Sequence, residues 1–373
     1  MIEKYQYIPI IKTTDAELRG YEELDGSVKD GVLPLFELTK SRKSKYNVEA
    51  TVHKRIDSLK DIVGDHRPFI LDITSHEDLA NDEIYEFGDE INGFDNWCSF
   101  VESFRADLKL IPVIHMLPPE EHLDHEIKSQ IERLAANFEY LAFRYTPFDF
   151  VDDGYMTTKD LVNEFTHYIE LIKGSFDIEK LILVIDGQYI EKSLFNSKVS
   201  VIKELLSIFE SNRQPCRTSI TTSSFPSYVK GHEDDCYDDY GTLTILEKRF
   251  FRTICNEAKM NSIIYGDYAS IHPVRKIQGG GNWVPRIDFP LSESIIYKRF
   301  RRDDGGYVRC GEKMAVETKF LSNPNPCWGE EQIKLASKGK PQGKSPSFWI
   351  SVRLNLFISR LFLDGELPIC HVK

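Results

Sequence analysis

Hydrophobic and polar positions divide the chain into two alternating kinds of segment. Short runs of β-branched and other apolar residues are separated by longer stretches in which apolar residues recur every three or four positions. The short runs are typical of buried strands, and the longer spacing is typical of helices that cover them. Ile127, Ile131, Leu134 and Phe138 illustrate the helical spacing. Eight apolar runs are present, at residues 7–12, 32–38, 68–73, 110–116, 140–145, 181–186, 217–223 and 262–268.

This alternation predicts parallel βαβ units, because parallel strands need a crossover segment between them and a helix usually supplies it. The intervals between successive runs leave room for one helix each. An open, doubly wound sheet would produce the same alternation. The count of eight favours a closed (β/α)8 TIM-like barrel of the α/β class.

The pattern changes after Pro273. Three consecutive glycines at 279–281 are followed by stretches around 295–300 and 307–310 that look extended. Residues 337–347 are rich in Gly, Lys, Pro and Ser and precede an apolar helix expected at 348–362. We therefore expect a barrel over residues 1–273 and a C-terminal α+β extension over 274–373 that packs on it.

Composition and charge narrow the classes of function. The formal net charge is −12, which disfavours non-specific binding to nucleic acid, because phosphate contacts need clustered cations. No apolar run approaches the length of a membrane span, so no membrane partner is expected. The seven cysteines are irregularly spaced and contain no CxxC pair, which indicates free thiols and a cytoplasmic location.

Polar residues stand near the ends of most predicted strands. In a parallel barrel these ends form the open mouth, where chemistry takes place. A strand that is buried on both faces should prefer apolar residues there, so a shared charged pocket is expected. The residues are Lys12, Glu37, Asp72, His115, Arg144, Asp186, Ser223 in the run 221–224, and Asp267.

Each of these residues has a functional and a structural interpretation. Glu37, Asp186 and His115 are candidate acid or base catalysts, although His115 could instead be a hydrogen-bonded structural residue. Lys12 and Arg144 suit a phosphate or carboxylate ligand, and Arg144 could instead pair internally with Asp186 or Glu37.

The other candidates are ligand contacts. Asp72, Ser223 and Asp267 are expected to contact a ligand, while Asp72 could instead cap the next helix. Oxygen ligands at Glu37, Asp72, Asp186 and Asp267 would suit a divalent metal, but their spacing does not require one. No other cofactor is indicated.

Several stretches together resemble the Beta protein family of phages, prophages and bacterial mobile elements, over nearly the whole chain. The resemblance rests on residues 7–12 with Glu17, then on 33–37, 71–73, 185–186, 223–226, 265–268 with 272–273, and 327–330. It implies a barrel-like fold and a place in gene clusters linked to antiphage defence, beside a toxic or effector protein.

The chain departs from the family pattern in the last predicted helix. In the family this helix carries a tryptophan followed by paired histidines, whereas this chain has Trp349 followed by Arg353 and Asn355. Trp349 and Arg353 are four residues apart, so they share a helix face that could fold over the mouth and contact a ligand. Alternatively, Trp349 packs on the flank of the barrel.

Two functions follow as the leading hypotheses, ahead of a third, a purely structural protein that binds a partner. The first is a component of a phage- or prophage-associated antiviral defence or toxin-control system that recognises a ligand or partner through the charged mouth, beside a protein effector or toxin encoded nearby. The second is a metal-assisted or acid/base hydrolase acting on a phosphorylated or nucleotide-like substrate. The fold alone cannot decide between them.

Overall fold

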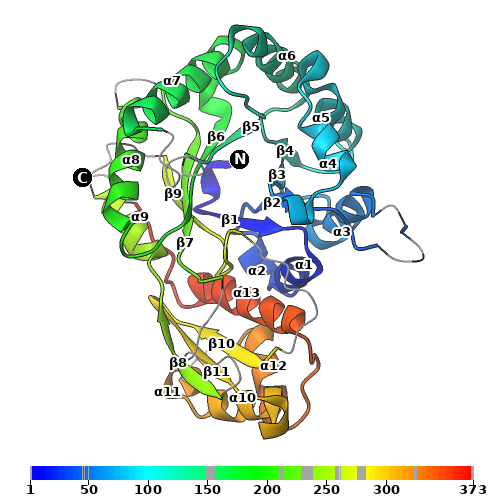
Figure 1. Cartoon of the computed structure of the whole chain (residues 1–373), viewed down its shortest axis with the longest axis vertical. Coiled ribbons are helices and arrows are strands. Elements are labelled where there is room, and N and C mark those ends of the chain that lie inside the picture. The colour runs from blue at the N-terminus through cyan, green and yellow to red at the C-terminus, as the bar shows by residue number, and fades with distance from the viewer. Residues whose placement is uncertain are drawn as a thin grey trace.

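The computed structural model describes residues 2–43, 45, 47–48, 50–147, 156–210, 213–227, 238–256, 260, 262–274, 283–322 and 326–370. Figure 1 shows a ring of strands wrapped by helices, with a smaller sheet and further helices below it.

Eight parallel strands build the ring, as the sequence predicted. Their spatial order is β4-β3-β2-β1-β9-β7-β6-β5. The strands are β1 (Tyr7–Lys12), β2 (Leu35–Leu38), β3 (Phe69–Ile73), β4 (Leu110–Pro112), β5 (Leu141–Tyr145), β6 (Leu181–Tyr189), β7 (Arg217–Ser223) and β9 (Ile263–Asp267).

The ring closes between β4 and β5 through a narrow seam. A single parallel bridge joins Val113 to Ala142, and the backbone N–H of Ile114 donates to the carbonyl of Ala142 at 2.7 Å. The other neighbouring strands share longer ladders; β6 and β7, for example, pair from Ile182 to Tyr189. The closed arrangement is that of a TIM-like barrel and excludes the open sheet.

Helices form the outer layer of the barrel (Figure 1). Helix α7 shows why they form where they do: the side chain of Thr157 accepts from Asp160 N, Asp160 accepts from Thr157 N, and this capping box starts the helix. The helices are α1 (Asp15–Glu22), α2 (Gly26–Lys29), α3 (His53–Val63), α4 (Asp82–Phe87), α5 (Ile91–Ser103), α6 (Glu121–Asn137), α7 (Thr158–Ser175), α8 (Phe195–Ser207) and α9 (Glu247–Cys255), with short 3-10 turns η1 (Ile2–Lys4), η2 (Glu77–Leu79) and η3 (Ile178–Lys180).

Side chains alternate between two cores along each strand, because successive strand residues point to opposite faces. One set faces the helices. The other set fills the barrel interior, and Ile2 and Tyr5 of the N-terminal segment pack against it. The interior set includes Ile8, Ile10, Leu33, Leu35, Ile70, Ile111, Val113, Ala142, Ile182, Val184, Ile264 and Tyr268. The barrel is therefore a packed core rather than a pore.

A second, antiparallel sheet of order β10-β11-β8 lies beside the barrel. It is formed by β8 (Asp239–Thr244), β10 (Arg286–Pro290) and β11 (Ser294–Arg299). Strand β8 precedes the last barrel strand β9 in the chain, so the extension takes one strand from within residues 1–273. A division of the chain at residue 273 separates this strand from its partner β11.

Four helices and one 3-10 turn complete the extension: η4 (Arg302–Asp304), α10 (Gly306–Ala315), α11 (Thr318–Leu321), α12 (Trp328–Ser337) and α13 (Pro346–Leu363). The stretch 307–310, which looked extended in the sequence, lies in α10 instead. Its apolar residues Tyr307 and Cys310 belong to a core with the second sheet and α13, and this packing decides its conformation.

Helix α13 connects the two units. Its residues Trp349, Val352 and Leu356 belong to the core of the extension, whereas Leu354, Phe357, Ile358 and Leu361 belong to the core between barrel strands and helices. In Figure 1 this helix lies between the barrel and the second sheet. The extension therefore packs on the barrel as one continuous body.

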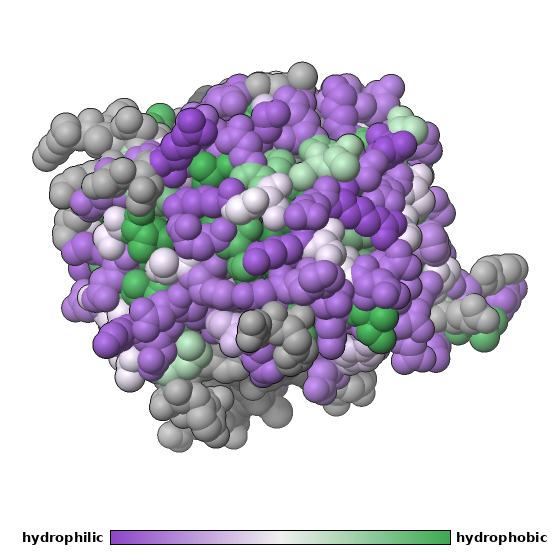
Figure 2. Space-filling model, turned by 90° about the horizontal axis from the view of Figure 1, so that it is seen from above, coloured by the Kyte–Doolittle hydropathy of each residue, from purple (hydrophilic) through white to green (hydrophobic). Residues whose placement is uncertain are grey.

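The outer face seen from above, over the helices at the top of Figure 1, is mostly hydrophilic, with apolar residues scattered among polar ones (Figure 2). Within the described part of the chain, no helix combines the length and the apolar character needed to cross a membrane. The cysteines that the structure describes, namely 98, 216, 255, 310, 327 and 370, are free thiols. Cys236 lies outside the described residues.

Candidate functional site

Five charged side chains from five different strands meet at the C-terminal end of the barrel interior. They are Lys12 of β1, Glu37 of β2, Asp72 of β3, Arg144 of β5 and Asp186 of β6. Each is two residues beyond an interior apolar residue, such as Ile10 before Lys12, and so points to the same side. We call this group the mouth cluster.

Arg144 is the centre of the mouth cluster. Its Nη1 donates to Glu37 Oε2 and to Asp72 Oδ2, both at 3.0 Å. Its Nε and Nη2 donate to Asp186 Oδ2 at 3.0 and 2.8 Å. One guanidinium thus connects carboxylates from three strands, which the rigid fork of arginine donors makes geometrically feasible.

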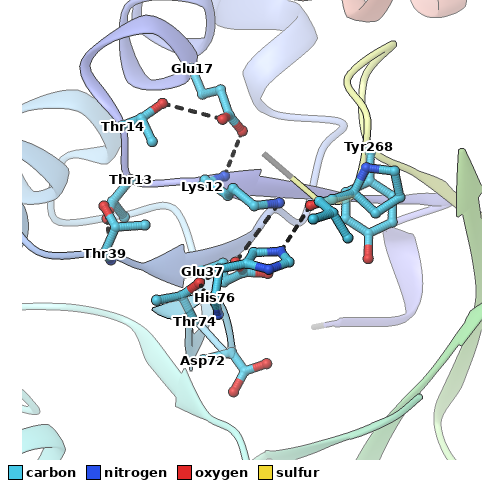
Figure 3. Close-up of polar contacts among 12 residues, drawn as sticks. Lys12, Thr13, Thr14, Glu17, Glu37, Thr39, Asp72, Thr74, His76 and Tyr268 are labelled. Atoms are coloured by element: carbon cyan, nitrogen blue, oxygen red, sulfur yellow. Dashed lines mark hydrogen bonds and ion pairs between the residues drawn. The ribbon is translucent and has the colours of Figure 1, made fainter. Parts of the chain in front are cut away.

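Tyr268, the residue directly after β9, joins the cluster from the opposite wall. Its hydroxyl donates to Asp186 Oδ2 at 2.5 Å and accepts from Arg144 Nη2 at 3.2 Å. The ammonium of Lys12 lies 5.1 Å from the centre of the Tyr268 ring and 3.8 Å from Glu37 Oε1. Figure 3 shows Lys12, Glu37 and His76 pointing toward one another, with Tyr268 beside them.

Hydrogen bonds from residues at and just beyond the strand ends fix these side chains. Thr74 Oγ1 donates to Glu37 Oε1 at 2.8 Å, and the N–H groups of Ile73 and Gln188 donate to Asp72 and Asp186 at 2.9 Å each. The cluster is also deeply buried: Glu37 is 1% exposed and Asp186 is 0% exposed. The mouth floor is therefore held rigidly.

Burial and nearby charges affect Glu37 and Asp72 differently. Burial opposes ionisation of Glu37, but the charges of Lys12 and Arg144 outweigh it and lower the pKa of Glu37 to about 2. For Asp72, burial raises the pKa, and Arg144 compensates only in part. The cluster thus places side by side one carboxyl group that is firmly ionised and one that protonates more readily.

His115 lies just beyond β4 and beside the cluster. Its Nε2 is 3.8 Å from Asp72 Oδ1, and its ring stacks on Trp97 with 4.7 Å between ring centres. Gln130 fixes its backbone by accepting from His115 N at 2.8 Å and donating to His115 O at 3.1 Å. Burial lowers the pKa of His115 to about 4, so the ring is neutral near pH 7.

The mouth cluster leaves little room for a divalent cation. Glu37, Asp72 and Asp186 all direct an oxygen at the Arg144 guanidinium, so a metal ion would have to displace it. Over the residues that the structure describes, no group of three or more His, Cys, Asp or Glu side chains is placed to hold a metal ion.

Asp267 does not join the mouth cluster. It ends β9, but it lies on the face of this strand that packs toward the helices, where Tyr7 Oη donates to its Oδ1 at 2.6 Å. Burial raises the pKa of Asp267 to about 6. The next residue, Tyr268, points into the barrel instead, because side chains alternate along the strand.

Ser223, which was expected to contact a ligand, makes hydrogen bonds within the protein instead. Its Oγ donates to the carbonyl of Ile271 at 2.8 Å and accepts from Phe225 N at 3.1 Å. These bonds tie the segment after β7 to the segment after β9, so Ser223 supports the loops beside the mouth.

Trp349 and Arg353 lie inside the extension and at its border with the barrel. Trp349 is 4% exposed, and its ring stacks on Tyr307 with 5.2 Å between ring centres. Arg353 Nη1 donates to Asp288 Oδ2 at 2.6 Å, and its guanidinium lies 4.0 Å from the centre of the Phe225 ring. Helix α13 therefore uses both residues for packing, and Trp349 packs in the core of the extension rather than on the flank of the barrel.

Sequence reasoning missed Tyr268 and Thr74 as members of the site. Strand alternation offered a signal for Tyr268: counting by twos from the interior Ile264 reaches Gly266 and then Tyr268. Thr74 offered no comparable signal, because its contact with Glu37 depends on the loop that follows β3.

Comparisons with known proteins agree with one another on family. A family model described as Beta protein matches residues 7–362. Protein beta of Enterobacteria phage P4 is 26% identical over 363 residues, which covers 96% of this chain and 93% of the phage protein. Among solved structures, a glycoside hydrolase is similar over 74% of this chain and 64% of its own, with 10% identity and a TM-score of 0.42. Old Yellow Enzyme from Pichia sp. AKU4542 is similar over 70% of this chain and 78% of its own, with 11% identity and a TM-score of 0.31.

Proposed function

Because this chain belongs to the Beta protein family, we propose that it is a recognition protein of a phage-associated antiviral defence or toxin-control system. In this proposal, the mouth cluster binds a polar ligand or a segment of a partner protein. Binding there controls an effector or toxin encoded nearby. The protein acts in the cytoplasm, where such an effector would act.

The mouth cluster is the observation that supports recognition. Immediately below it, the barrel interior is apolar, with Ile10, Leu35, Ile70, Ala142 and Val184. If apolar residues also occupied the next layer, where the mouth cluster lies, no charged group would have to lose its hydration on folding. Buried ion pairs are often no more stabilising than hydrophobic residues of similar volume. Two cations and three carboxylates in this layer are therefore better explained by a ligand than by stability.

The pairing within the cluster favours binding over catalysis. All three carboxylates already contact Arg144, so none is left as an unengaged base. A preformed and rigid set of donors and acceptors is well suited to select one polar ligand, because a mismatched ligand would leave buried groups unpaired.

A hydrolase is the second candidate, and one observation favours it. The pKa values of Glu37 and Asp72 are shifted in opposite directions, a pattern that general acid and base pairs use. In that case Asp72, beside the neutral His115, would carry the proton. Lys12 would orient a phosphorylated or nucleotide-like substrate, with or without a divalent metal.

Replacing Asp72 by Asn tests the recognition proposal. Asn keeps the size of the side chain, and the raised pKa of Asp72 indicates that its charge does not stabilise the fold at neutral pH. Cells carrying the chain with its native neighbouring genes would be challenged with a panel of phages. We expect Asp72→Asn to weaken protection about tenfold or more, corresponding to roughly 1.4 kcal/mol of recognition energy, with an unchanged melting temperature.

Glu170→Gln is the matched control, because Glu170 is exposed on α7 and pairs with the neighbouring Lys173. It should protect like the unsubstituted protein. If the unsubstituted protein protects against no phage and co-purifies with no effector, the recognition proposal is wrong. Turnover of nucleotides or phosphate esters by the purified protein, lost in Asp72→Asn while ligand binding persists, would instead support the hydrolase.

A further inference from the structure

A polar pocket lies outside the mouth cluster, at the same end of the barrel. It has a volume of about 380 Å³ and is lined by Asp15, Ser41, Arg42, Lys43, Lys54 and Arg55. Asp15 begins α1 directly after β1, residues 41–43 follow β2, and Lys54 and Arg55 lie in the first turn of α3. We call this site the rim pocket.

The rim pocket carries an excess of positive charge. Arg42, Lys43, Lys54 and Arg55 contribute four positive charges and Asp15 one negative charge, which leaves a net charge of +3. Asp15 is already paired with Arg55. In the described part of the chain, Arg42, Lys43 and Lys54 form no ion pair with a carboxylate, although the chain as a whole has a net charge of −12.

Two buried polar atoms in the rim pocket lack a hydrogen-bond partner among the described residues. They are Ser41 Oγ, on a side chain that is 3% exposed, and Arg55 Nε, on one that is 9% exposed. The other donors of Arg55 are used, because its Nη1 donates to Asp15 and its Nη2 to the carbonyl of Lys40. A buried hydroxyl and a buried N–H without partners are costly unless a ligand satisfies them.

The start of α3 adds to this environment. Its first turn contains His53, Lys54 and Arg55 and no acidic residue, although Thr51 Oγ1 accepts from His53 N at 3.4 Å and Glu83 Oε2 accepts from Val52 N at 2.8 Å. Cations at a helix N-terminus oppose the helix dipole, whereas an anion there is favourable. Glu83 already supplies a negative charge at this end of α3, so the side chains of Lys54 and Arg55, rather than the helix terminus, supply the attraction for an anion in the pocket.

We propose that the rim pocket binds the oligophosphate group of a small molecule, such as a nucleoside di- or triphosphate. Its volume lies in the range of small-ligand pockets, about 300–1,000 Å³, and exceeds what one phosphate group needs. Its net charge of +3 matches a di- or triphosphate better than a single phosphate. Nucleic acid fits less well, because the cations gather in one pocket of an acidic protein rather than along a stripe.

The rim pocket is a different site from the mouth cluster. In the mouth, the charges of Lys12 and Arg144 are balanced by three carboxylates. We therefore assign the phosphate-binding role that the sequence suggested for those two cations to Arg42, Lys43 and Lys54, which form no ion pair with a carboxylate of the described residues. The binding site does not depend on what the mouth recognises.

Calorimetric titration of the full chain tests this inference. The probes are inorganic tripolyphosphate, ATP, orthophosphate and a short single-stranded oligonucleotide, each in buffer of low and of moderate salt. We expect tripolyphosphate and ATP to bind more tightly than orthophosphate. Ser41→Ala and Lys54→Gln should each weaken binding about tenfold, since each removes a hydrogen bond to a charged group. Ser41→Ala removes a hydroxyl that has no hydrogen-bond partner among the described residues, so it should fold normally.

Lys60→Gln provides the control, because Lys60 lies further along the same helix α3 and pairs with Asp107. It removes the same charge and should bind the probes like the unsubstituted protein. Equal loss of binding in Lys60→Gln and Lys54→Gln would mean that only overall charge matters and would overturn the pocket. Absence of tripolyphosphate binding would also overturn it. So would an oligonucleotide that binds more tightly than tripolyphosphate and whose affinity Ser41→Ala does not change.

Discussion

At the scale of single residues, Arg144 has the largest role in the mouth. Its side chain is 11% exposed and connects Glu37, Asp72 and Asp186 with Tyr268. The sequence left open whether this arginine binds a ligand or pairs internally, and the structure gives it internal partners. Because its partners come from separate strands, Arg144 links β2, β3, β5 and β6 and so bridges the narrow seam between β4 and β5.

Replacing Arg144 by Met should destabilise the protein strongly. The substitution leaves three buried carboxylates without their common cation, which costs about 3–5 kcal/mol in comparable cases. Urea denaturation followed by circular dichroism would measure the change in the free energy of unfolding. Arg252→Met is the control: Arg252 forms an exposed pair with Glu293, and loss of such a pair changes stability by about 0–1 kcal/mol. Equal effects of the two substitutions would contradict the central role of Arg144.

Glu37 should make stability depend on pH in acid. Its folded-state pKa of about 2 lies below the ordinary value of 4.5, so its contribution is fully present above pH 4.5 and is lost as the pH falls toward 2. At pH 7 the protein should be more stable than its Glu37→Gln variant by at most roughly 3 kcal/mol. Urea midpoints measured from pH 6 to pH 3 should converge for the two proteins. A gap that stays constant or widens in acid would show that Glu37 is not held in its ionised form.

At the scale of elements, the sequence predicted the positions of the strands well, but it predicted less well which side chains point into the barrel. The runs 7–12 and 217–223 coincide with β1 and β7, because apolar composition marks a buried strand directly. Asp267 was expected in the mouth because it ends a strand, but facing depends on the register by twos. The helical conformation of Tyr307 and Cys310 was also missed, since packing against the second sheet determines it. Contacts of this kind join distant segments and leave little trace in local sequence.

Two helix glycines, one packed closely between α1 and α13 and one in an open position on α7, should respond in opposite ways to replacement by alanine. A Cβ on Gly20 would lie 2.8 Å from the Ser351 carbonyl oxygen and 2.9 Å from Leu354 Cδ2. Gly20→Ala should therefore destabilise the protein by about 1–3 kcal/mol through overpacking. Gly174, in α7, has no atom of the described residues within 4 Å of the same position, and Gly174→Ala should stabilise the helix by roughly 0.5–1 kcal/mol. Thermal melting distinguishes the two, and stabilisation by Gly20→Ala would mean that the two helices are less tightly packed.

At the scale of the whole molecule, the barrel and the extension are parts of one folded body. Helix α13 contributes residues to both cores, and β8 reaches the second sheet from inside the barrel sequence. The sequence anticipated an extension that packs on the barrel. It did not indicate that β8 joins the second sheet, because the sequence of a single short strand after β7 does not show which sheet it will join.

Truncation should therefore destroy the barrel along with the extension. A protein ending at residue 273 lacks α13, exposes the apolar faces that this helix covers, and leaves β8 without β11. We expect it to be insoluble or to lack a cooperative transition, whereas the full chain should unfold in one calorimetric peak. A truncated protein that melts cooperatively, or two separate peaks for the full chain, would show that the units are independent.

The position of β8 also has a consequence for the order of events during synthesis. This strand leaves the ribosome before the last barrel strand, and its partner β11 begins about fifty residues later, a delay of roughly 3–10 s at about 5–20 residues per second. Through that interval β8 has an unpaired edge, and during its first part, until β9 emerges, the barrel beside it is also still open. The nascent chain is thus most exposed to mispairing just before its final hundred residues emerge, and slow translation of that region would prolong the exposure.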